Sequence, residues 1–157
     1  AWHIHKNFIS YCLLVFLQSP PGHTFSLELN TTGQLPARHF RVRVVLECLC
    51  SRKQLLGDIL CFLHDSDNRL PRDENSNLLH TLCTCSYLDV EKVTSWVQLM
   101  VQSAWLLLPQ SRYCQLTVLP SSKSCKFQLT TTSKMNICME MMFAVQQGSS
   151  TVVLSRQ

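Results

Sequence analysis

The sequence predicts an α+β fold with a mostly antiparallel mixed sheet and packed helices. The chain has 157 residues and is 46% apolar, which is enough for one domain with a sizeable core. Segments in which apolar residues alternate come first, segments with helical spacing follow, and alternating segments return in the last third. Strands, then helices, then strands again are typical of α+β proteins. We therefore treat residues 1–157 as one domain.

Seven segments predict strands, because apolar residues alternate in them or because a short apolar run ends at a turn-forming cluster. They cover residues 11–17, 25–29, 40–50, 113–119, 125–130, 136–145 and 151–154. The first two predict strands around a turn. Residues 40–50 show the alternation best, since apolar residues fall on one face while Arg41 and Arg43 fall on the other. With Arg38 and His39, these arginines form a small basic patch, which is most simply a solvated strand face.

Two helices are predicted between these strands. Ser51 and Gln54 fit a capping box at the start of residues 51–64, where apolar residues then recur at helical spacing. Asp89 can cap a second helix that runs to Leu108 and stops at Pro109. The apolar stripe expected on this helix consists of Val93, Trp96, Val97, Met100, Ala104, Leu107 and Leu108. The charged residues 65–77 between the two helices predict an exposed loop.

Charge and composition exclude several classes of function. Fourteen Lys and Arg against ten Asp and Glu leave a net charge of +4, well short of a nucleic-acid-binding footprint. The four glycines are scattered and form no Gly-rich phosphate loop. The most apolar helical stretch, residues 99–108, has about half the length that a bilayer crossing needs.

Nine cysteines are the most unusual feature of the composition. Cys48 with Cys50 and Cys83 with Cys85 form two C-x-C pairs, whereas structural zinc sites usually contain C-x₂₋₄-C pairs. The first pair lies on an apolar strand face, which favours core packing; the second pair is less decided. Disulfides stay open as an alternative in an oxidising compartment, and at least one thiol would then be unpaired because nine is odd.

Two further clusters are weaker candidates for a metal site. Asp65 and Asp67 begin like a calcium loop, but the Gly and Glu that such a loop needs further on are missing. His3 and His5 share one side of an extended segment without a third ligand nearby, so an exposed polar edge is favoured. We therefore predict no metal site and no cofactor.

Five blocks of the sequence carry a family resemblance. They are residues 40–50 (FRVRVVLECLC), 56–64 (LGDILCFLH), 82–92 (LCTCSYLDVEK), 119–126 (LPSSKSCK) and 140–148 (EMMFAVQQG). In these blocks the chain resembles the inositol trisphosphate receptor-interacting protein family, and within it the "-like" branch. The first ten residues look unlike the family.

The resemblance implies a male-abnormal-type domain, which is related to the nucleotidyltransferase fold. It also implies a longer parent protein with a transmembrane anchor ahead of this domain, and hence a membrane localisation. Residues 1–157 would then be one incomplete nucleotidyltransferase-like domain.

This relationship poses a chemical question. Active nucleotidyltransferases hold two magnesium ions with two carboxylates on one strand and a third on a neighbouring strand. The strand expected to carry the pair, residues 10–17, contains no acid. Glu140 is a possible remnant of the third carboxylate, with a structural salt bridge or an edge role as the alternative. One carboxylate cannot organise two divalent ions, so we predict a pseudoenzyme without catalytic residues.

The expected function is therefore a non-catalytic interaction domain that binds and modulates a membrane receptor or channel. The resemblance suggests the inositol trisphosphate receptor as the partner, and no nucleic acid is expected. A nucleotide-binding protein or nucleotidyltransferase with a divergent metal site is the alternative, and a zinc-stabilised scaffold is a third class.

Overall fold

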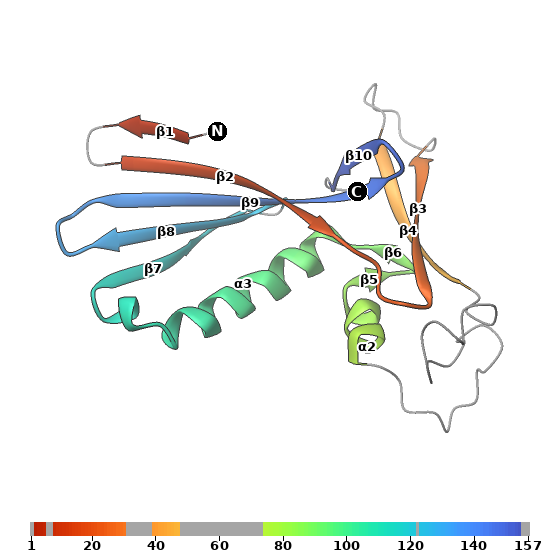
Figure 1. The fold of residues 1–157 in the computed structure, drawn as a ribbon, viewed down its shortest axis with the longest axis horizontal. Helices are drawn as coiled ribbons and strands as arrows, with labels where there is room; N and C mark the ends of the chain where they lie inside the picture. The colour runs from red at the N-terminus through yellow and green to blue at the C-terminus, as the bar shows by residue number, and fades with distance from the viewer. Residues whose placement is uncertain (1, 6–7, 31–38, 48–73, 122, 155–157) are drawn as a thin grey trace.

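Two β-sheets and two α-helices make up the part of the chain that the structure describes (Figure 1). The computed structural model describes residues 2–5, 8–30, 39–47, 74–121 and 123–154. Within these ranges the larger sheet has six strands in the order β1-β2-β9-β8-β7, with β10 beside β9, and the smaller sheet has four in the order β3-β4-β6-β5. The strands are β1 (Trp2–His5), β2 (Phe8–Leu17), β3 (His23–Asn30), β4 (His39–Leu46), β5 (Cys83–Thr84), β6 (Tyr87–Leu88), β7 (Cys114–Leu119), β8 (Cys125–Thr131), β9 (Asn136–Gln147) and β10 (Ser150–Val153). The helices are α2 (Glu74–Thr81), α3 (Val90–Leu106) and the short 3₁₀ helix η2 (Pro109–Arg112).

The predicted fold class is confirmed in its coarse form. Among the described strands β2 and β9 pair in parallel, and the other pairings are antiparallel. The sheet content is therefore mixed but mostly antiparallel, and α3 is the main helix.

All seven predicted strands are present, with one correction to their bounds. β2 and β3 follow one another around a turn, as predicted, and they belong to different sheets. β4 ends at Leu46, earlier than predicted, and residues 48–50 with Cys48 and Cys50 lie outside the described residues. β1, which contains His3 and His5, is an edge strand of the larger sheet and pairs with β2.

The segment before α3 differs most from expectation. The predicted helix 51–64 and residues 65–73 of the predicted loop lie outside the described residues. The last four residues of that loop, 74–77, instead open α2. The β5–β6 hairpin was not predicted, because its two turn residues, Cys85 and Ser86, have φ values of 52° and 68° without being Gly or Asn.

Helix α3 begins as predicted and packs differently from the prediction. Asp89 is the N-cap, and its carboxylate accepts hydrogen bonds from the backbone N–H groups of Glu91 (3.0 Å) and Lys92 (3.4 Å). The side that packs on the core is Val90, Val93, Val97 and Val101. The predicted stripe is thus right for Val93 and Val97 and wrong for Met100, Ala104, Leu107 and Leu108, which are exposed.

One core joins the two sheets to the start of α3. Its buried members come from β4, α2, β6, α3, β8, β9 and the residue after β10, and they are Val42, Leu79, Leu88, Val90, Val93, Cys125, Phe127, Phe143, Val145 and Leu154. Figure 1 shows α3 starting where the two sheets meet and ending near the start of β7, at the far end of the larger sheet. Among the described helices, none has both the length and the apolar character needed to cross a membrane.

Candidate functional site

The strand expected to carry paired acids lies directly beside Glu140. β2 and β9 run in parallel, and in their register Cys12 is the partner of Glu140. Alternate residues of a strand share a face, so Ser10, Cys12 and Leu14 line the same side of the sheet as Glu140. Val15 and Phe143 are partners on the opposite side, where the core lies. The geometry therefore places a serine, a cysteine and a leucine around Glu140.

Glu140 is hydrogen-bonded to a serine from the turn before β8. The hydroxyl of Ser124 donates a 2.8 Å hydrogen bond to Oε1 of Glu140, and its oxygen lies 3.1 Å from the hydroxyl oxygen of Ser121. Ser124 is only 2% exposed, so this contact is shielded from solvent. Lys126 is the cross-strand partner of Glu140, yet among the described residues no cation lies within 4 Å of this carboxylate. Among the described residues Glu140 therefore accepts one side-chain hydrogen bond, and no salt bridge forms there.

This arrangement provides too few free oxygen ligands for a pair of metal ions. One oxygen of Glu140 already accepts a hydrogen bond, and the neighbouring strand supplies no second carboxylate. Two magnesium ions need several oxygen ligands to offset the cost of losing their water. In the described part of the chain, no three His, Cys, Asp or Glu side chains come close enough to hold a metal ion.

The cysteines that can be placed are free thiols in varied surroundings. In the described ranges these are Cys12, Cys83, Cys85, Cys114, Cys125 and Cys138. Burial raises the pKa of the Cys125 thiol from 9.0 to about 11, and the thiol donates a 3.3 Å hydrogen bond to the backbone carbonyl of Thr94. Burial also raises the pKa of Cys83, with Lys92 opposing the shift and Asp89 adding to it. Both thiols are therefore protonated near neutral pH, which disfavours metal binding.

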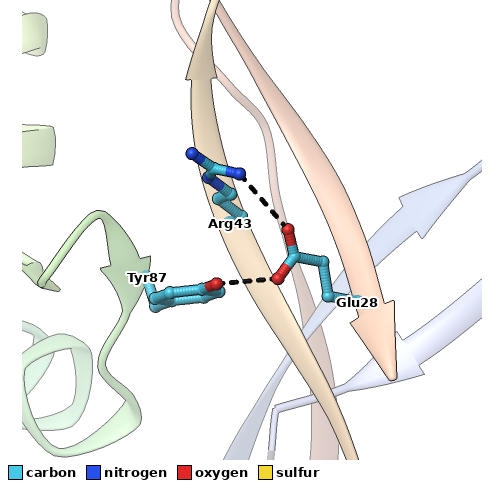
Figure 2. Close-up of polar contacts among 3 residues, drawn as sticks. All are labelled: Glu28, Arg43 and Tyr87. Carbon is cyan, nitrogen blue, oxygen red and sulfur yellow. Dashed lines mark hydrogen bonds and ion pairs between the residues drawn. The ribbon is translucent and has the colours of Figure 1, made fainter. Parts of the chain in front are cut away.

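A second polar cluster lies on the smaller sheet and joins three of its strands (Figure 2). The Tyr87 hydroxyl of β6 donates a 2.7 Å hydrogen bond to Oε2 of Glu28 on β3. A guanidinium nitrogen of Arg43 on β4 lies 3.6 Å from Oε1 of the same carboxylate, and the guanidinium carbon of Arg41 lies 3.9 Å from the centre of the Tyr87 ring. The hydrogen bond to Glu28 raises the pKa of Tyr87, followed by burial and by the charge of Glu28, with Arg41 and Arg43 opposing.

The predicted basic patch is therefore part of a mixed cluster. Arg41 and Arg43 lie where alternation placed them, whereas Arg38 is outside the described residues. Sequence reasoning missed Glu28 and Tyr87. Glu28 lies in the alternating strand 25–29, so the sequence could have predicted which face of the sheet it occupies. The position of Tyr87 depends on a hairpin whose turn has no sequence signature.

A groove of about 530 Å³ lies between the ends of β2 and β9 and the start of β3. Its walls are formed by two aromatic residues, one leucine, one glycine and five uncharged polar residues, and they are Phe16, Leu17, Gln18, Ser19, Thr24, Phe25, Gln146, Gln147 and Gly148. Among the described residues no Lys or Arg lines it, so none of them offsets the charge of a triphosphate there. Gln146 is six residues beyond Glu140 on β9, a distance of about 20 Å along an extended strand.

Comparison with known proteins identifies relatives of this chain. It is 34% identical over 149 residues to mouse inositol 1,4,5-trisphosphate receptor-interacting protein-like 1, covering 94% of this chain and 27% of that protein. The rat protein of the same name is 34% identical over 146 residues, covering 92% of this chain and 26% of that protein. The resemblance to this family is confirmed.

A bovine protein is a more distant relative. Bovine inositol 1,4,5-trisphosphate receptor-interacting protein is 26% identical over 115 residues, covering 66% of this chain and 20% of that protein. No family model matches the sequence. The chain spans about a quarter of the length of the mouse and rat relatives.

Proposed function

We propose that this chain is a non-catalytic interaction domain, derived from a nucleotidyltransferase-like fold, that binds and modulates a membrane receptor or channel. The observation that carries the proposal is the pairing of Glu140 with Cys12 on a strand without acids. The names of the mouse, rat and bovine relatives support an inositol trisphosphate receptor as the class of partner. The parent protein would be anchored in the membrane by a segment outside residues 1–157.

Binding to the receptor is the direct test. The tagged 157-residue chain is immobilised and exposed to detergent-solubilised inositol trisphosphate receptor, and bound receptor is measured by immunoblot. Saturable capture that excess untagged chain removes supports the proposal. A receptor that stays entirely in the flow-through, while the chain is folded by circular dichroism, counts against this partner.

Calorimetry tests the non-catalytic part of the proposal. Titration of the chain with ATP or GTP in the presence of magnesium should give no metal-dependent heat, because Glu140 has no second carboxylate beside it. Magnesium-dependent nucleotide binding that Glu140→Gln abolishes would favour the enzyme alternative. A Glu28→Gln variant is the matched control, since Glu28 is a sheet-face glutamate of the other sheet.

A further inference from the structure

The outer side of the second half of α3 carries large exposed apolar side chains and no charged residue. Leu99 and Met100 are 65% and 53% exposed, and Leu106 and Leu107, seven residues further on, are 76% and 86% exposed. Residues three, four and seven apart lie on one side of a helix, so these side chains share one side, with the exposed uncharged residues Gln102 and Ser103 on the turn between them. Leu108 and Tyr113 extend this side beyond the helix end, with 47% and 66% exposure. We call these six residues the α3 surface.

The exposed leucines are held in ordered backbone. The N–H groups of Leu107 and Leu108 donate 3.1 Å hydrogen bonds to the carbonyls of Ala104 and Trp105. The turn continues into η2, where the N–H of Ser111 bonds to Leu108 at 3.1 Å and that of Tyr113 bonds to Gln110 at 3.0 Å. The leucines are therefore fixed in an outward position and do not belong to a frayed end.

The charged residues in the sequence between Glu91 and the start of β9 have one sign. Between Glu91 and Glu140 the sequence holds five Lys or Arg and no Asp or Glu. Two of these cations lie at the end of the α3 surface: Arg112 closes η2, and Lys134 stands in the turn after β8. The register of β7 and β8 brings that turn beside the start of β7, because Cys114 is the partner of Thr131.

Apolar side chains with an aromatic residue and cations at their border match one kind of partner. Leucines that project from the end of an element can enter the acyl boundary of a bilayer, while Tyr, Lys and Arg settle among the headgroups. We infer that the α3 surface docks on an anionic lipid membrane. Charge complementarity favours a lipid surface with negative headgroups, since the sequence between Glu91 and Glu140 contains no acid that would repel it. This inference concerns a surface distinct from the Glu140 region and does not depend on the receptor.

Sedimentation with vesicles tests the inference. The 157-residue chain is mixed with phosphatidylcholine vesicles that contain or lack phosphatidylserine, and the bound fraction is measured at low and at high salt. We expect binding to the phosphatidylserine vesicles that weakens with salt. Arg112→Gln with Lys134→Gln should weaken binding roughly 25-fold, since each cation near an anionic surface contributes about fivefold. Leu106→Gln with Leu107→Gln should weaken it at least tenfold, on the order expected for two lost apolar insertions.

Matched controls separate docking from general stickiness. Leu46→Gln changes a 43% exposed leucine on β4 of the other sheet, and Lys123→Gln changes an exposed cation in the turn before β8; both variants should bind vesicles like the parent chain.

A chain that stays in the supernatant with both vesicle types overturns the inference. So does a dimer in light scattering that the leucine changes dissociate while vesicle binding is absent, because the α3 surface then joins two copies. If the leucine variant fails to fold, the cation variant and the salt dependence still decide.

Discussion

The two halves of α3 have similar residues and opposite surroundings. In the first half Val93 is 0% exposed and packs in the core that joins both sheets, whereas Leu107, the C-cap residue that ends the second half, is 86% exposed. Both halves are apolar enough to be buried. What differs is the neighbouring strand, since Phe127 and Phe143 of the larger sheet belong to the same core as the first half. Burial along this helix is therefore set by what the sheets place against it.

This contrast separates stability from recognition. The first half carries the contacts that hold the sheets together, so changes there should alter the free energy of unfolding. In the second half Val101 still packs against the core, but the outer side offers exposed apolar area, so changes on that side should alter binding and leave stability nearly unchanged. Substitutions along one helix can break or sharpen this division.

Val93→Ala should have the largest effect on stability. Removing two methyl groups from a fully buried site costs about 2 kcal/mol, because the transfer free energy is lost and a cavity remains. Urea unfolding followed by circular dichroism measures the change. A cost below about 0.5 kcal/mol would mean that the start of α3 is not part of the core.

Cys125 should make the first half of α3 sensitive to alkaline pH. Its pKa in the folded chain is about 11, above the ordinary 9.0, because burial penalises the thiolate. A raised pKa means that the contribution to stability is fully present below pH 9 and is lost as the pH rises through 11. Unfolding free energy should therefore fall across that window. Cys125→Ala should have a shallower fall, and equal slopes in the two chains would contradict the assignment.

Asp89→Ala should cost roughly 1–2 kcal/mol. The change removes the N-cap of α3 and also the acceptor for the Thr84 hydroxyl, which lies 2.9 Å from Oδ2. Asp89→Asn is the matched variant, because an amide oxygen still caps the helix and should recover most of the loss. Thermal unfolding of both variants checks the prediction, and equal losses would show that the charge matters more than the cap.

The start of α3 and its packing were predictable to different degrees. Asp89 predicts where the helix begins, because a carboxylate just before a periodic apolar segment can accept hydrogen bonds from the unpaired N–H groups of the first turn. This effect is purely local. Periodicity also shows which residues share a side of the helix. It cannot show which side a sheet covers, and so Met100 and Leu107 were expected in the core although they are exposed.

In the candidate site, too, some features could be predicted from the sequence and others could not. The absence of acids in β2 and the strand that carries Glu140 are readable from the sequence, and so are the strand faces of Arg41 and Arg43. The contacts of Glu140 with Ser124 and of Glu28 with Tyr87 join residues 16 and 59 positions apart. Such pairs depend on turns and hairpins whose geometry the local sequence does not specify, as in the positive φ values at Cys85 and Ser86.

Thr94→Val should stabilise the chain by about 1 kcal/mol. The Thr94 hydroxyl oxygen is buried and, among the described residues, has no hydrogen-bond partner. Valine keeps the shape and removes the unsatisfied polar atom, while the backbone carbonyl of residue 94 still accepts from Cys125. Urea unfolding measures the gain. A loss would indicate that the hydroxyl has a partner that this arrangement does not include.

Leu107→Gln should have the smallest effect on stability and thereby tests the comparison most directly. The side chain is almost fully exposed, so the change should stay within about 0.5 kcal/mol of the parent chain, the usual range for surface positions. Val93→Gln is the matched change in the first half and should prevent stable folding, because an amide would be buried without a partner. If Leu107→Gln instead destabilised the chain by 1 kcal/mol or more, which is about the size of the Asp89 effect, the second half of α3 would be covered in solution. The division of the helix into a structural half and a recognition half would then fail.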